Sequence, residues 1–146
     1  MTRTIILLAA VAGAAVVAAV GSAQATPRNG ALHVTKECSD YHGLPGEFCT
    51  ITSSNIPQIK PGMRVVYSSA LAFPTLNSDL VLDGPGNNNA SGHVVLDVPT
   101  GSGVVTFSGG TGRFSKLQAR VDVTYDREAD LWHWDGTYAF SRSDGD

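Results

Sequence analysis

Charged residues are scarce in this chain of 146 residues, at 16% of the sequence, whereas an average soluble domain has about 25%. The formal net charge is only −3. A chain with a slight acidic excess does not offer the basic surface that binds nucleic acid or anionic membranes. We therefore expect neither of these as a partner.

Motifs that would indicate a known enzyme class or a cofactor site are also missing. The sequence contains no Gly-x-Ser-x-Gly elbow and no phosphate-binding loop ending in Gly-Lys-Ser/Thr. Its four histidines are scattered without the spacing of metal ligands. The sequence predicts no metal and no cofactor, and it leaves open whether the protein is an enzyme.

Only two cysteines occur, Cys38 and Cys49. They do not form the Cys-x-x-Cys pattern of redox enzymes, and a zinc site would need more ligands at close spacing. In an exported protein a lone pair of this kind forms a structural disulfide. A loop of this length stabilises the fold by about 3 kcal/mol in the chain-entropy account.

Export is indicated by the first twenty-five residues. Arg3 precedes an uncharged apolar run from Ile5 to Val20, and small residues ending in Ala23-Gln24-Ala25 follow. This order predicts a signal peptide, residues 1–25, cleaved after Ala25. The alternative is an uncleaved anchor, but the run is shorter than the ~20 residues that span a bilayer. We expect one secreted or periplasmic domain, residues 26–146, with no membrane association after cleavage.

Glycine and proline recur so often after residue 25 that no long helix fits. Short β-branched and aromatic runs lie between these turn residues, and several alternate apolar with polar positions, as strands over one core do. The predicted strands are Ala31–Glu37, Glu47–Ser53, Met63–Phe73, Asp79–Leu82, His93–Val98, Val104–Phe107, Leu117–Tyr125 and Leu131–Phe140. Eight antiparallel strands predict an all-β fold, either a closed barrel or a sandwich.

The most specific motif is a cluster of glycines, Gly109, Gly110 and Gly112, between two apolar runs. It indicates a tight structural turn with positive φ angles. The sequence Gly-Gly-Thr-Gly-Arg-Phe resembles the turn of plant dirigent proteins and allene oxide cyclases, and residues 131–138 are similar to the closing strand of small secreted bacterial relatives. The resemblance implies an eight-stranded antiparallel barrel, homo-oligomers, and metal-free cyclisation or stereo-directing chemistry on small apolar molecules.

Aromatic residues on the predicted strands are candidates for binding such a molecule, with filling of the core as the alternative. These candidates are Tyr67, Phe107, Trp132, Trp134 and Tyr138. Polar candidates for the cavity are Tyr67, Asp97, Arg120 and Asp122. Arg120 and Asp122 share a strand face, so a pair on the surface is the alternative for these two. We expect a barrel that binds a small apolar or aromatic ligand. The alternatives are an isomerase or cyclase, which inward-facing charge would favour, and a structural envelope module, which a packed interior would favour.

Overall fold

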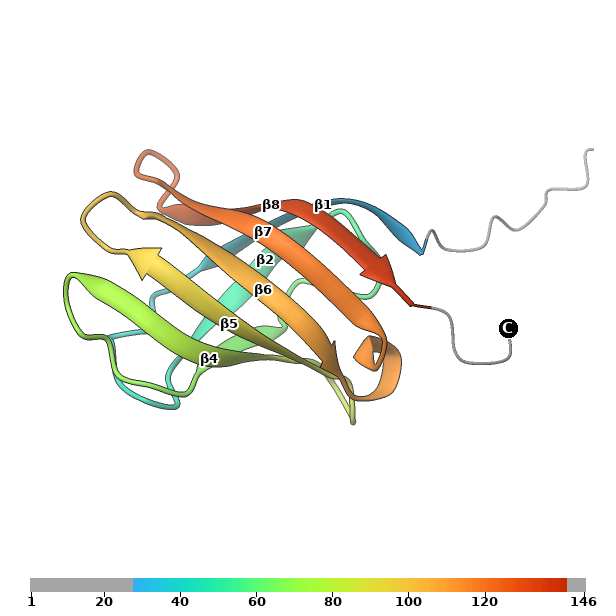
Figure 1. The fold of residues 1–146 in the computed structure, drawn as a ribbon. Coiled ribbons are helices and arrows are strands. Elements are labelled where there is room, and N and C mark those ends of the chain that lie inside the picture. The colour runs from blue at the N-terminus through green and yellow to red at the C-terminus, as the bar shows by residue number, and fades with distance from the viewer. Residues whose placement is uncertain (1–27, 142–146) are drawn as a thin grey trace, which may run out of the picture.

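The computed structural model describes residues 28–141, so the predicted signal peptide lies outside the described residues. The described chain forms eight antiparallel strands and one short 3-10 helix (Figure 1). The strands are β1 (Asn29–Glu37), β2 (Phe48–Ser54), β3 (Arg64–Tyr67), β4 (Thr75–Asp83), β5 (Asn89–Asp97), β6 (Ser102–Gly110), β7 (Leu117–Asp126) and β8 (Leu131–Phe140). The helix, η1 (Gly112–Phe114), lies between β6 and β7.

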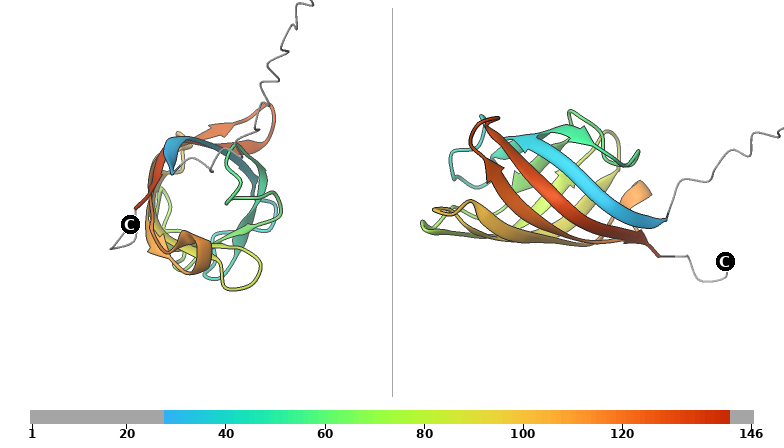
Figure 2. Two further views of the ribbon diagram at one scale, coloured as in Figure 1. Left: turned by 90° about the vertical axis from the view of Figure 1, so that its right-hand side faces the viewer. Right: turned by 90° about the horizontal axis from the view of Figure 1, so that it is seen from above.

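The sheet is closed. Each strand pairs with the next along the chain, and β1 also pairs with β8. This last ladder contains eight residue pairs, from Asn29 opposite Ala139 to Lys36 opposite Trp132. Seen along its axis, the molecule is a ring of strands (Figure 2). The predicted barrel is therefore confirmed and the sandwich is excluded.

Alternation along the strands separates the interior of the barrel from its surface. In β7 the residues Leu117, Val121 and Val123 are buried, whereas Gln118, Arg120, Asp122 and Thr124 are exposed. The same pattern in β8 buries Trp134 and Tyr138. The core thus lies inside the ring, where side chains from opposite strands meet.

The two ends of the barrel differ. Four loops, residues 38–47, 68–74, 98–101 and 127–130, lie at what we call the open end. The ends of the described chain and the other three loops lie at the opposite, closed end (Figure 1). Side chains from the closed-end loops are buried in the core, namely Ile56, Ile59, Met63 and Phe114. Side chains thus fill the closed end.

The glycine cluster lies at the closed end. Gly109, Gly110 and Gly112 have φ angles of +91°, +159° and +57°, as a tight turn of glycines requires. A Cβ on Gly112 would stand 2.2 Å from the side-chain oxygen of Asn88 and 2.4 Å from the backbone oxygen of Asn87. The turn therefore needs glycine here for backbone conformation and for close approach to the β4–β5 loop.

Hydrogen bonds fasten this turn to the start of β5. The Thr111 N–H donates to the Asn89 carbonyl (2.7 Å), and the Asn89 N–H donates to Thr111 Oγ1 (3.1 Å). The Arg113 N–H donates to Asn88 Oδ1 (2.9 Å). The fully buried Phe114 follows directly. The turn thus places the Phe114 ring in the core at the closed end.

The predicted strand Met63–Phe73 is too long. Only Arg64–Tyr67 pair as β3, and the chain then leaves the sheet. The Leu71 N–H donates to the Gly43 carbonyl in the loop after β1 (2.9 Å) instead of to a neighbouring strand. Apolar alternation continues to residue 73, but these residues form a loop in which Leu71 packs against the core and Phe73 is 73% exposed.

Five other strands are longer than predicted, because polar residues and glycines at their ends also pair; β1 and β7 gain one or two residues, and β4, β5 and β6 gain three or more. Strand β4 begins at Thr75 rather than Asp79, β5 begins at Asn89 rather than His93, and β6 includes Ser102 and Gly110. These segments have the composition of turns, and only their partners in the closed ring make them strands.

Replacing Gly112 by alanine should destabilise the fold more than the same change at Gly46. Both glycines have positive φ, +57° and +84°, but a Cβ on Gly46 would meet nothing within 4 Å. We expect Gly46→Ala to cost about 1 kcal/mol of unfolding free energy, and Gly112→Ala about 2 kcal/mol more because of the collision with Asn88. Urea unfolding followed by tryptophan fluorescence measures both; equal losses would contradict this account.

Candidate functional site

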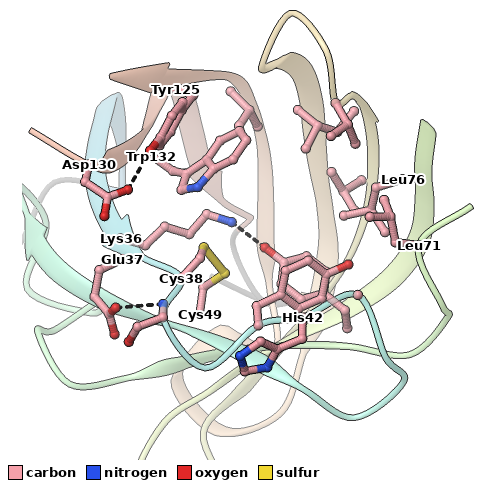
Figure 3. A pocket seen from close by; sticks show the side chains of 18 residues that line it. Lys36, Glu37, Cys38, His42, Cys49, Leu71, Leu76, Tyr125, Asp130 and Trp132 are labelled. Atoms are coloured by element: carbon pink, nitrogen blue, oxygen red, sulfur yellow. Dashed lines mark hydrogen bonds between the residues drawn. A yellow bond between two sulfur atoms is a disulfide. The ribbon is translucent and has the colours of Figure 1, made fainter. Parts of the chain in front are cut away.

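A cavity of about 360 Å³ lies at the open end of the barrel (Figure 3). One side is apolar and is formed by Leu71, Leu76, Val94, Leu96, Val98 and Val123. Aromatic rings of Tyr41, Tyr67, Tyr125 and Trp132 add to the wall. Sites for small molecules typically measure ~300–1,000 Å³ and have mostly apolar walls with few polar groups. This cavity is at the lower end of that range.

A disulfide between Cys38 and Cys49 forms part of the wall. It confirms the predicted pairing and ties the start of the 38–47 loop to β2. Glu47 orders the same loop by accepting the N–H groups of His42 (3.0 Å) and Leu44 (2.8 Å). These hydrogen bonds, the Leu44 bond foremost, lower the pKa of the Glu47 carboxyl. The disulfide and the Glu47 hydrogen bonds thus hold the 38–47 loop in place as one wall of the cavity.

Lys36 is the polar side chain at the inner end of the cavity. It is only 4% exposed, because it follows Leu32 and Val34 on the inward face of β1. Its amine hydrogen-bonds to the Tyr67 hydroxyl. It also lies 5.1 Å from the ring centre of Tyr67 and 5.0 Å from that of Trp134.

Burial determines the protonation of this lysine. No carboxylate in residues 28–141 forms an ion pair with Lys36; the four ion pairs found there all join a histidine to an acid. Contact with two aromatic faces favours the ammonium form, but loss of water opposes it more strongly. Burial lowers the pKa of Lys36 from 10.5 to about 7, so a large fraction of the amine is neutral at neutral pH.

The acids at the rim of the cavity are engaged with their own neighbours. Glu37 accepts the Ser39 N–H (2.9 Å), and Asp130 accepts the Tyr125 hydroxyl (2.5 Å). Figure 3 shows both acids to one side of the Lys36 amine, which points away from them toward the Tyr67 hydroxyl that accepts its hydrogen bond. They give the entrance a negative charge without neutralising the lysine.

Two phenols lie together in the cavity wall, the buried Tyr67 and the partly buried Tyr41. The rings of Tyr41 and Tyr67 are 4.8 Å apart. Burial raises the pKa of both hydroxyls, so each stays protonated. The Tyr41 hydroxyl is buried and has no hydrogen-bond partner among residues 28–141. It could therefore bond to a ligand that enters the cavity.

The structure divides the predicted aromatic residues. Tyr67 and Trp132 line the cavity, whereas Phe107, Trp134 and Tyr138 are buried in the core and are not among its lining residues. Trp134 contacts Lys36 and packs against Phe107, with ring centres 5.6 Å apart. Lys36 thus packs against the Trp134 ring at the inner end of the cavity.

Three of the predicted polar candidates do not reach the cavity. Asp97, Arg120 and Asp122 are exposed, and Arg120 and Asp122 alternate with inward-facing residues of β7. Their assignment to the cavity was wrong. The sequence reasoning missed Lys36, although Leu32-x-Val34-x-Lys36 on one predicted strand puts the lysine in line with two core residues.

Comparison with protein-family models, with curated proteins and with solved structures finds no match to this chain. Within residues 28–141, no three His, Cys, Asp or Glu side chains come together so as to hold a metal ion. The same residues include no helix long and apolar enough to cross a membrane. The cavity and its lysine therefore carry the functional argument.

Replacing Lys36 by methionine should change the pH dependence of stability. Between pH 7 and pH 10.5 the wild type takes up a proton at this site when it unfolds, so its stability rises with pH through that window. The full effect is of order 5 kcal/mol, at about 1.4 kcal/mol per pKa unit. Lys36→Met lacks this titration, so its stability relative to wild type should rise as the pH falls from 10.5 to 7. The lost hydrogen bond to Tyr67 lowers its stability by the same amount at every pH.

Urea unfolding between pH 6 and pH 10 measures this difference. The titratable groups around the cavity, Glu37, His42, Tyr41, Tyr67 and Asp130, are present in both proteins, so their contributions largely cancel. Lys60, which is exposed, provides the control, since Lys60→Met should track wild type at every pH. Parallel curves for Lys36→Met and wild type would mean that the buried amine keeps its proton.

Proposed function

We propose that the protein binds a small apolar, preferably aromatic, molecule in the cavity at the open end of the barrel. The observation that carries this is the combination of apolar walls, a volume of about 360 Å³ and one buried polar pair, Lys36 with Tyr67. Apolar walls supply affinity, and a few placed polar groups fix orientation. A barrel whose only requirement was stability would fill this end as it fills the other.

The charges favour a neutral ligand. Glu37 and Asp130 at the rim oppose the entry of an anion, and Lys36 at the inner end opposes a cation. A neutral molecule with one carbonyl or hydroxyl oxygen avoids both penalties. Its oxygen would meet the Lys36 amine or the Tyr67 hydroxyl, while its apolar part contacts Leu96 and the ring of Trp132.

We further propose that this is a secreted or periplasmic member of the allene oxide cyclase and dirigent-like superfamily, and that it forms homo-oligomers. The closed eight-stranded barrel and the glycine turn at residues 109–112 support the kinship. The disulfide supports an oxidising compartment, and the signal-like sequence of residues 1–25 supports export.

An isomerase or cyclase is the second candidate, favoured by the Lys36–Tyr67 pair. A lysine of lowered pKa can act as a base near neutral pH, and a protonated phenol can act as an acid beside it. Such an enzyme would convert its ligand with time, whereas a binding protein would release it unchanged. The remaining alternative, a structural envelope module, does not require the cavity.

Binding can be tested with N-phenyl-1-naphthylamine, a neutral aromatic probe that fluoresces in apolar surroundings. We expect saturable binding of one probe per chain, with a dissociation constant on the order of micromolar. The two tryptophans of the chain, Trp132 and Trp134, lie at or below the cavity, so their fluorescence should fall in parallel.

Two aspartate substitutions near the end of β5 localise the binding. Val98 lines the cavity, whereas Val95 is 49% exposed and lies outside the barrel. Val98→Asp should weaken probe binding roughly tenfold, because it places a charge in an apolar wall. Val95→Asp should bind like wild type. Equal affinities of both variants would place the probe elsewhere and contradict the proposed site.

A further inference from the structure

Lys36 combines features that the other two lysines lack. The sequence contains three lysines, Lys36, Lys60 and Lys116, and the last two are exposed. Lys36 alone lines the cavity, with its amine hydrogen-bonded to a buried phenol and no carboxylate as partner. In Figure 3 it is seen between Trp132 and the disulfide, at the inner end of the cavity. A molecule that reaches this end therefore meets the amine.

The surroundings of Lys36 suit a nucleophile. An ammonium has no lone pair, so only the neutral amine can attack a carbonyl carbon, and desolvation in an apolar site is a common way to obtain it. A structural lysine would instead be paired with an acid or would extend its amine to solvent. Lys36 does neither, although the carboxylates of Glu37 and Asp130 line the same cavity.

We propose that Lys36 forms an imine with a small, neutral, apolar aldehyde held in the cavity, an inference that rests on the proposed ligand-binding function. The Nζ lone pair attacks the carbonyl carbon, and the carbonyl oxygen takes up a proton to give a carbinolamine. The C–O bond then breaks. Oxygen leaves as water, carrying the two protons that the amine has lost, and a C=N bond remains. No oxidant or reductant takes part.

Tyr67 is placed to act as the proton donor of this step. Its hydroxyl is hydrogen-bonded to the attacking nitrogen, and burial raises its pKa, so it keeps a proton to donate to the carbonyl oxygen. The ring of Tyr67 also holds the lysine chain in place from one side, and Trp134 does so from below. The apolar walls limit the water that would hydrolyse the imine.

The test uses 2-naphthaldehyde as probe and 2-naphthalenemethanol as its counterpart without a carbonyl. The purified, disulfide-bonded protein is incubated at pH 7 with one equivalent of aldehyde and sodium cyanoborohydride, which reduces an imine to a stable secondary amine. Intact mass and peptide mapping then locate the label. We expect one naphthylmethyl group, with roughly tenfold more on Lys36 than on Lys60, Lys116 or the terminal amine.

Two variants provide the controls. Lys60→Met should be labelled like wild type, because it removes only an exposed amine. Lys36→Met, its fold verified by circular dichroism, should show only the background of the exposed amines. Labelling spread evenly over all lysines, or equal labelling of the two variants, would overturn the proposal.

Displacement of N-phenyl-1-naphthylamine separates this proposal from the one on which it rests. If 2-naphthalenemethanol displaces the probe but the aldehyde does not label Lys36 selectively, the cavity binds ligands and the imine is refuted. If the probe itself does not bind and Lys36 is unlabelled, ligand binding and imine formation are both contradicted. Selective labelling together with displacement supports both.

Discussion

The ladder between β1 and β8 is the constraint on which the rest of the structure depends. It joins the first strand to the last over eight residue pairs and so turns a sheet with two edges into a ring. Closure removes exposed strand edges, which otherwise invite pairing with other chains. It also fixes which side chains share the interior. Lys36 stands opposite Trp132 in this ladder, and Val34 stands opposite Trp134, so closure itself brings the lysine to the tryptophans that surround it.

Stability and binding are divided between the two ends of this ring. The closed end is packed by Phe114 and by side chains of the β2–β3 loop, and the glycine turn is fastened there by hydrogen bonds to β5. The open end keeps a cavity beneath its loops, which are joined by the Leu71–Gly43 hydrogen bond and braced by the Cys38–Cys49 disulfide and by Glu47. The packed closed end thus stabilises the ring, while the side chains of the open end leave room for a ligand.

The barrel could be predicted from the sequence because its strongest signals are local. Alternation along residues 117–125 and 131–140 gives the strand faces, and the glycines at 109, 110 and 112 give a turn that the structure contains. The strand ends could not be predicted so well. Asn89 and Ser102 have turn composition and become strand residues by pairing across tight hairpins, Asn89 with Asp83 and Ser102 with Asp97. The loop 68–74 shows the opposite effect, since its residues alternate like a strand but leave the sheet, and Leu71 lines the cavity.

The site was harder to predict because its central residue, Lys36, is of a charged type that is rarely found in a core. A lysine on the inward face near the end of a strand is usually expected to bury its apolar stem and extend its amine to water. Here the 38–47 loop folds back over the end of β1, and the Gly46 N–H donates to the Tyr67 carbonyl (2.7 Å), which closes that route. Asp97, Arg120 and Asp122 lie outside the cavity, and the alternation of residues 117–125 already puts Arg120 and Asp122 on the polar face of β7.

The energetics of Lys36 connect the fold with the proposed chemistry. A methionine at this position would fill the same space without the penalty of removing an amine from water, so packing alone does not account for a lysine. The penalty is tolerated because the rest of the ring is apolar and closed, and because the Tyr67 hydroxyl satisfies the nitrogen. The apolar surroundings that make the lysine costly also keep it neutral, in contact with the cavity and beside a phenol that holds its proton. The burial that makes Lys36 destabilising is thus what provides the neutral amine with which a carbonyl ligand would react.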